Sequence, residues 1–178
     1  MTHGQTQYQV RFDWGVDGLQ AIGEAADVAV WVDVLDADGS TAVESEVPVV
    51  RGSLRNRRAV AEWVLAQQGG RGERFMVAIV AAGERWAGGG PRFAVEDLLA
   101  AGAIIDALAD LGIDYCSPEA AAAAAAFTGL RNATGHLIGA SASGRTLVAD
   151  GRRTDIEAAI ELDVSSEVQP VGEFDLHA

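Results

Sequence analysis

Cysteine, histidine and basic residues are scarce in this sequence, and each scarcity removes a class of function. The one cysteine, Cys116, cannot form an intramolecular disulfide, and with three scattered histidines the chain offers no CxxC or HxxxH spacing for zinc. Thirteen basic residues stand against 26 acidic ones, so the formal charge is −13 and the summed field repels phosphate backbones and anionic lipid. We therefore expect no zinc, no nucleic acid and no membrane partner.

Long hydrophobic runs and a secretory signal are also missing. The richest small apolar segment, Ala120 to Ala126, is too short to cross a bilayer, and residues 1–9 lack the basic start and apolar core of a signal peptide. The expected location is the cytoplasm. With 178 residues, 49% of them hydrophobic and 22% charged, the chain has the length and composition of a single domain over residues 1–178.

Apolar runs alternate with helical periodicity along the chain. Tyr8–Asp13 alternates like a half-exposed strand, Val16–Glu24 has helical spacing, and Asp27–Leu35 is a β-branched run typical of a strand buried on both faces. Three further strands are predicted, an edge strand at Val47–Val50, a strand at Phe75–Ala82 and a short strand at Val168–Val171. Further helices are predicted from Leu54 to Gly69-Gly70 and at Val95–Leu111. The chain after Pro118 is predicted to be helical, with breaks at Gly129, Gly135, Gly144 and Gly151. This alternation predicts an α/β layered sandwich with a central mixed or mostly parallel sheet flanked by helices.

Acidic side chains lie near the end of the Asp27–Leu35 strand, where ligands collect in open α/β sheets. Asp33, Asp36 and Asp38 supply oxygen donors that suit magnesium, which usually takes one or two carboxylates plus substrate phosphate and water. For Asp36 and Asp38 a solvated turn is the simpler explanation. Asp33 lies within an apolar run, where an unpaired carboxylate is costly to bury, so metal ligation, a structural hydrogen bond and placement at the strand end are all possible explanations.

A glycine-rich loop, Gly83–Ala94, joins the next apolar run to a helix. Its backbone amides, the side chains of Arg85 and Arg92, and the helix N-terminus together favour an anion. The loop matches neither the GxxxxGK[ST] nor the GxGxxG nucleotide motif. Glu96 and Asp97 begin the helix, where the macrodipole alone would stabilise carboxylates by roughly 0.3–1 kcal/mol. An anion site and an ordinary loop that precedes a helix both explain this passage.

The Gly52–Asn56 segment is a third candidate site, because its serine and asparagine stand one turn apart at the start of a predicted helix. Helix capping alone would explain the serine. Ser143 with His136, and Cys116 with any histidine, could be written as nucleophile and base, but no third group or elbow motif accompanies either pair.

The order of several segments along the chain is more informative than any one of them. These segments are Tyr8–Gly15, Val30–Leu35, Gly52–Asn56, Ala81–Gly83 followed by Val95–Gly102, Ser141–Leu147, Asp155-Ile156, Leu162-Asp163 and Val168–Val171. In this order they resemble the 2-phosphosulfolactate phosphatase family over nearly the whole chain. The strand, glycine loop and Glu-Asp helix form the most specific block of the resemblance.

The resemblance implies a magnesium-dependent phosphatase that removes phosphate from 2-phospho-3-sulfolactate or a similar small phosphorylated acid, in the sulfonate metabolism that leads to coenzyme M. Asp33, Glu96 and Asp97 are then the expected catalytic residues, with Asp33 and Asp97 as the expected Mg²⁺ ligands. The residues expected to bind substrate are Gly52, Ser53, Asn56, Gly83, Arg85 and Arg92.

The chain departs from the family pattern in two places. Family members follow the Val-Asp-Val-Leu strand with an arginine and a threonine-rich turn, where this chain has Asp36–Thr41, and they carry several tens of residues where it has only Ala42–Arg51. The alternative hypothesis is therefore a catalytically degenerate member that acts as a small-anion binding or homo-oligomerisation module. Under either hypothesis we expect Asp33 at the carboxyl end of a central strand, with Gly83 at the same edge of the sheet.

Overall fold

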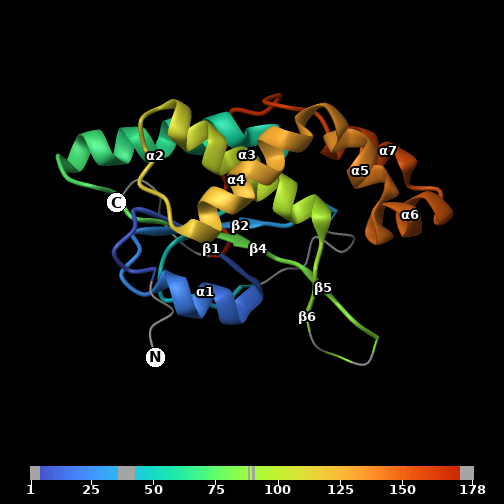
Figure 1. Cartoon of the computed structure of the whole chain (residues 1–178), viewed down its shortest axis with the longest axis horizontal. Helices are drawn as coiled ribbons and strands as arrows, with labels where there is room; N and C mark the ends of the chain where they lie inside the picture. Colours follow the sequence, from blue (N-terminus) through green and yellow to red (C-terminus); the bar gives the residue numbers. More distant parts are fainter. Residues whose placement is uncertain (1–4, 36–42, 88, 90, 173–178) are drawn as a thin grey trace.

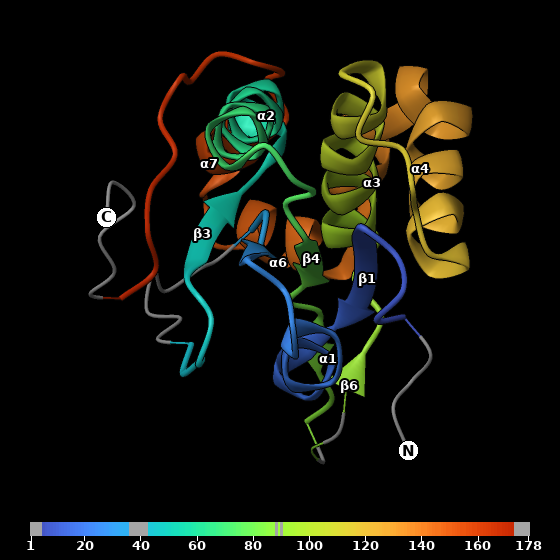
Figure 2. The same ribbon diagram turned by 90° about the vertical axis from the view of Figure 1, so that its left-hand side faces the viewer.

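Four parallel strands form the central sheet (Figures 1 and 2). The structure is a computed structural model and describes residues 5–35, 43–87, 89 and 91–172. The strands are β1 (Val10–Trp14), β2 (Val28–Val32), β3 (Val49–Gly52) and β4 (Val77–Ala81), and they lie in the order β1-β4-β2-β3. The central strands β2 and β4 are buried at every residue, which explains their unbroken apolar sequences.

Helices cover both faces of this sheet, as predicted for an α/β layered fold. On one face lies α1 (Gly15–Gly23), whose Leu19 shares an apolar cluster with Trp31 of β2. On the other face lie η1 (Leu54–Asn56), α2 (Arg57–Arg71) and α3 (Val95–Asp110), with α4 (Pro118–Leu130) packed against α3 (Figure 2). A Cβ added at Gly102 of α3 would lie 2.1 Å from the carbonyl oxygen of Ala123, so glycine permits this close helix contact.

The C-terminal part of the chain forms a helical group and then an extended segment. The helical group consists of η2 (Arg131–Ala133), α5 (Thr134–Ala140), α6 (Ala142–Ala149) and α7 (Arg153–Ala159), and Figure 1 shows it beyond one end of the sheet. Residues 161–172, here called the strap, return along β3. The Arg51 N–H donates to the Gln169 carbonyl at 2.8 Å and the Val171 N–H to the Val49 carbonyl at 2.8 Å. The strap therefore covers the outer edge of β3 (Figure 2).

A two-stranded antiparallel hairpin follows β4, inside the loop that the sequence predicts as irregular. It consists of β5 (Glu84–Arg85) and β6 (Pro91–Arg92) and projects from the sheet (Figure 1). The Ser143 hydroxyl of α6 donates to the Glu84 carboxylate, which also pairs with Arg92 at 3.7 Å. These contacts tie the base of the hairpin to the helical group.

Most of the predicted elements are confirmed, and the main errors concern glycines. The helix after Gly52 continues through Gly69-Gly70 and ends at Gly72, whose φ of 71° gives a left-handed cap. Gly129, Gly135 and Gly144 lie inside α4, α5 and α6, so these three predicted breaks are misplaced by a few residues, whereas Gly151 lies between α6 and α7, as predicted. A Cβ at Gly144 would lie 2.3 Å from a carbonyl oxygen of α5, which shows that this glycine serves close packing.

The predicted strand at Val168–Val171 is also corrected. This segment belongs to the strap and makes a single isolated antiparallel bridge, between Pro170 and Val50. The predicted turn Asp36–Thr41, with the candidate ligands Asp36 and Asp38, lies outside the described residues. Within the described ranges, every helix is too short or too polar to span a membrane.

Candidate functional site

The carboxyl ends of all four strands meet at one edge of the sheet, because the strands are parallel. Val32, the last residue of β2, pairs in register with Gly52 of β3 and with Ala81 of β4. Asp33 directly follows β2 and Gly83 lies two residues beyond β4. The prediction that Asp33 and Gly83 share one edge of the sheet is confirmed.

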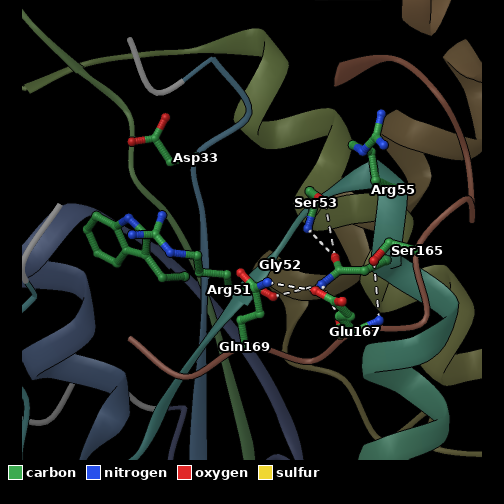
Figure 3. Close-up of a pocket in the computed structure, with 10 residues that line it drawn as sticks. Asp33, Arg51, Gly52, Ser53, Arg55, Ser165, Glu167 and Gln169 are labelled. Carbon is green, nitrogen blue, oxygen red and sulfur yellow. Dashed lines mark hydrogen bonds between the residues drawn. The ribbon is translucent and has the colours of Figure 1, made fainter. Parts of the chain in front are cut away.

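A polar pocket of about 190 Å³ opens at this edge, between the ends of β2 and β3 and the strap (Figure 3). Of the predicted site residues it brings together Asp33, Gly52, Ser53 and Asn56. Arg55, which lies within the predicted Gly52–Asn56 segment, also lines the pocket, and sequence reasoning missed the remaining lining residues, which are Trp31, Arg51, Ser165, Glu167 and Gln169. One available signal was Arg51, a charged residue that interrupts the apolar sequence of β3 immediately before Gly52.

Ser53 and Asn56 form the floor of this pocket and hold the start of η1. Asn56 Oδ1 accepts from the Ser53 N–H at 2.9 Å and from the Ser53 hydroxyl at 3.1 Å. Asn56 Nδ2 donates to the carbonyls of Arg51 and Glu167, both at 3.0 Å. The capping function expected for Ser53 is thus present, and Asn56 in addition joins β3 to the strap.

Gly52 is required at the end of β3 by packing. A Cβ at this position would lie 2.4 Å from Val30 Cγ1 and 2.6 Å from Ile104 Cδ1. A larger residue would therefore force the side chains of Val30 and Ile104, or the strand itself, to shift. The role of Gly52 in substrate binding remains a prediction beside this structural role.

Asp97, in the first turn of α3, links two loops of the carboxyl edge. Its Oδ1 accepts from the Val34 N–H at 2.9 Å and its Oδ2 from the Gly83 N–H at 3.0 Å. Burial raises the pKa of Asp97 well above its ordinary value, the negative charges of Asp33 and Glu96 raise it further, and the two N–H donors oppose the shift. The contacts make Asp97 a positioning residue for the loop that carries Asp33.

The other predicted residues lie outside the pocket. Glu96 begins α3 beside Asp97, as predicted, and is 3% exposed. Gly83 has a φ of 68°, which glycine tolerates readily, and it turns the chain into the hairpin. Arg85 and Arg92 belong to the hairpin, where Arg85 is exposed and Arg92 pairs with Glu84. The catalytic, metal-binding and substrate-binding roles of these residues stay predictions.

The pocket combines both signs of charge. Asp33 and Glu167 are acidic and Arg51 and Arg55 are basic, and Figure 3 shows Asp33 and Arg55 at opposite sides of the opening. Arg55 donates to the carbonyl of Ala158 at 2.6 Å and to the carboxylate of Glu161. In the described part of the chain, no three His, Cys, Asp or Glu side chains stand close enough to hold a metal by themselves.

One buried donor of the pocket lacks an acceptor. Trp31 lines the pocket and is 4% exposed, and its indole Nε1 has no hydrogen-bond partner among the residues that the structure describes. An unsatisfied buried donor costs about 1–3 kcal/mol, so native proteins usually pair such groups with protein, water or ligand. Within the described part of the chain, the indole N–H is therefore a buried donor without an acceptor, in a residue that lines this site.

Comparison with protein families supports the resemblance found in the sequence. The family model described as 2-phosphosulpholactate phosphatase matches residues 38–173, which include β3, β4, Gly52, Ser53, Asn56, Gly83 and the Glu96-Asp97 pair. A search of curated proteins finds no match. The family match begins after Asp33, so the similarity of residues 8–35 to the family rests on the sequence segments alone. Since the matched region covers most of the chain, the protein belongs to the 2-phosphosulpholactate phosphatase family, as a shortened member.

Proposed function

We propose that this chain hydrolyses a phosphate monoester of a small acid, with 2-phospho-3-sulfolactate as the first substrate to test. The observation that carries the proposal is the polar pocket at the carboxyl edge, which is lined by Asp33 together with Arg51 of β3 and Arg55 of η1. Family membership supports phosphatase chemistry. A polar pocket of about 190 Å³ has room for a small phosphorylated acid.

The donor set of the pocket suits Mg²⁺ that arrives together with substrate. Mg²⁺ commonly binds through one or two carboxylates plus phosphate oxygens and water, and half-buried Asp33 would supply the carboxylate. When bound, Mg²⁺ would polarise the phosphoryl oxygens and offset their charge. Asp97 is the second predicted ligand, and because both of its oxygens already accept backbone N–H groups, we assign it first to holding the Asp33 loop in place.

The protein groups then have defined tasks in the reaction. Arg51 and Arg55 hold the anionic substrate by charge, and Asp97 fixes the loop that carries Asp33. Water adds to phosphorus, the bond between phosphorus and the ester oxygen breaks, and the hydroxy acid leaves with a proton from that water. Because these groups are already in place when the substrate binds, little reorganisation of the protein is needed during hydrolysis, and this lowers the activation barrier.

Phosphate release from 2-phospho-3-sulfolactate, with and without Mg²⁺, tests this proposal. We expect Mg²⁺-dependent release that falls on the order of a hundredfold in Asp33→Asn. The matched control is Asp110→Asn, which changes an exposed carboxylate at the far end of α3. Activity that survives in both Asp33→Ala and Asp97→Ala would show that the reaction takes place elsewhere.

A second candidate function is binding of a small anion without turnover, as a degenerate family member or homo-oligomerisation module. It is favoured by the replacement of the family's arginine with Asp36 and by the absence, in the described residues, of a three-ligand metal group. Calorimetry with inorganic phosphate and Mg²⁺ distinguishes the two functions. Binding combined with undetectable phosphate release supports the second function, whereas release with turnover supports the first.

A further inference from the structure

The indole donor of Trp31 belongs to a residue that lines the pocket, and the N–H itself is covered by the surrounding protein atoms. Trp31 is the penultimate residue of β2, and it pairs in register with Arg51 of β3. Side chains of paired residues on parallel strands lie on the same face of the sheet, and both residues line the pocket. An acceptor that reaches the indole N–H is therefore close to the Arg51 guanidinium.

Neighbouring polar groups of the pocket are largely engaged with one another. Asn56 uses both its oxygen and its amide nitrogen for Ser53, Arg51 and Glu167, and Gln169 Nε2 donates to the Glu167 carboxylate at 2.7 Å. These groups shape the pocket but do not supply an acceptor to Trp31. A ligand that completes the hydrogen bonding must bring an acceptor oxygen.

The position of Trp31 relative to Asp33 indicates which ligand oxygen this is. The two residues are separated by one residue along the same chain, which corresponds to about 6.6 Å in an extended strand. Because residues two apart in a strand point to the same face, a small molecule with two anionic groups can lie beside both residues. With phosphate and Mg²⁺ at Asp33, the oxygen at Trp31 belongs to the second group.

We propose that Trp31 Nε1, with Arg51 beside it, binds a second oxyanion of the substrate, a carboxylate or a sulfonate. Trp31 then determines specificity, because a phosphate monoester with no second acidic group leaves the buried indole N–H without an acceptor. This inference rests on the proposed function for the placement of phosphate. Binding of the second oxyanion at Trp31 does not require turnover, so this inference and the proposed phosphatase function can fail separately.

The direct test observes the indole N–H itself. In ¹⁵N-labelled protein, Trp14, Trp31, Trp63 and Trp86 give four indole resonances that triple-resonance experiments assign. Titration with sulfoacetate, malate or inorganic phosphate, each with Mg²⁺, is expected to move the Trp31 resonance with the first two and to leave the other three in place. Movement with sulfoacetate alone or malate alone identifies the oxyanion. An unchanged Trp31 resonance, or equal movement of all four, overturns the proposal whether or not phosphate is released.

The second test compares substrates in the active enzyme. Trp31→Phe keeps an aromatic ring and removes the donor, and Trp63→Phe on α2 is the matched control. We expect the KM for a phosphorylated carboxylic or sulfonic acid to rise about tenfold in Trp31→Phe, the usual loss for one hydrogen bond to a charged group. The KM for glycerol phosphate should not change. Equal effects on both substrates would show a structural role only.

If Trp31→Phe does not fold, Arg51→Gln is expected to weaken the Trp31 response in the titration, and an unweakened response overturns the proposal.

Discussion

The carboxylate of Asp97 is held in place by groups with opposing effects on its charge. Burial and the charges of Asp33 and Glu96 favour the protonated form, while the N–H groups of Val34 and Gly83 favour the ionised form. The net effect raises the pKa, so the ionised form of Asp97 is less favourable in the folded chain than in the unfolded chain. The residue that aligns the Asp33 loop therefore does so at a cost in stability.

This cost predicts that the free energy of unfolding depends on pH, and comparison with Asp97→Asn isolates the contribution of Asp97. A raised folded-state pKa contributes stability that is fully present below the unfolded value of about 3.9 and is lost as pH rises through the folded value. We expect the free energy of unfolding of the wild type to decline relative to that of Asp97→Asn as pH rises from 4 upward. Urea denaturation of both proteins across that range measures the difference. If the wild type instead becomes more stable relative to Asp97→Asn as pH rises, the raised pKa of Asp97 is contradicted.

At the scale of elements, the strap is the part of the fold on which the pocket depends most. It supplies one wall through Ser165, Glu167 and Gln169, and it is joined to η1 by the Ser165 N–H, which donates to the Arg55 carbonyl at 2.9 Å. Asn56 adds its bond to the Glu167 carbonyl. These contacts connect residues that are more than a hundred positions apart in sequence.

Removing the Asn56 side chain should loosen the strap without unfolding the sheet. Asn56→Ala leaves the carbonyls of Arg51 and Glu167 and the Ser53 N–H without their partner, so we expect a loss of about 1–3 kcal/mol. Hydrogen exchange should become faster in residues 163–171 while β2 and β4 stay protected. Asn132→Ala in η2, where the side chain is exposed, is the control. Uniformly faster exchange over the whole chain would show that Asn56 supports the core and not the strap.

The sequence predicts the sheet edge well and the strap poorly, for physical reasons. Asp33 and Gly83 could be placed together because parallel strands bring their carboxyl ends to one edge, a rule that needs only the strand assignments. The strap has no periodicity, since it is held by individual hydrogen bonds to distant residues. Trp31 resembled an ordinary core residue, because its orphan N–H is visible only once its surroundings are known.

Glycine misled the sequence prediction for a related reason. Gly144, a predicted break, lies inside α6 and permits close approach to α5, and such a contact depends on the partner helix and not on the local sequence. Gly151 does lie between α6 and α7, as predicted, and its φ of 75° meets a local requirement of the backbone. Local requirements could thus be predicted, whereas requirements set by tertiary packing could not.

At the scale of the whole molecule, the charge of −13 opposes the binding of any anionic substrate. Arg51 and Arg55 offset this field locally, but Asp33 and Glu167 in the same pocket cancel their formal charge. A phosphorylated acid therefore approaches an acidic molecule through a pocket of mixed sign. Mg²⁺ experiences the opposite force and is drawn toward the chain.

Added salt should consequently change the affinity for a phosphorylated acid and the affinity for Mg²⁺ in opposite directions. The Debye length falls from about 30 Å at 0.01 M to about 8 Å at 0.15 M, so added salt removes the repulsion of the anion and the attraction of the cation. We expect calorimetry at these two salt concentrations to show tighter binding of a phosphorylated acid at saturating Mg²⁺ and weaker binding of Mg²⁺ alone, each by roughly two- to fivefold. Potassium chloride and sodium chloride should give the same slopes, because screening depends on ionic strength and not on ion identity. If anion binding weakens with salt instead, the field at the pocket is positive, and Arg51 and Arg55 outweigh the acidic surface that surrounds them.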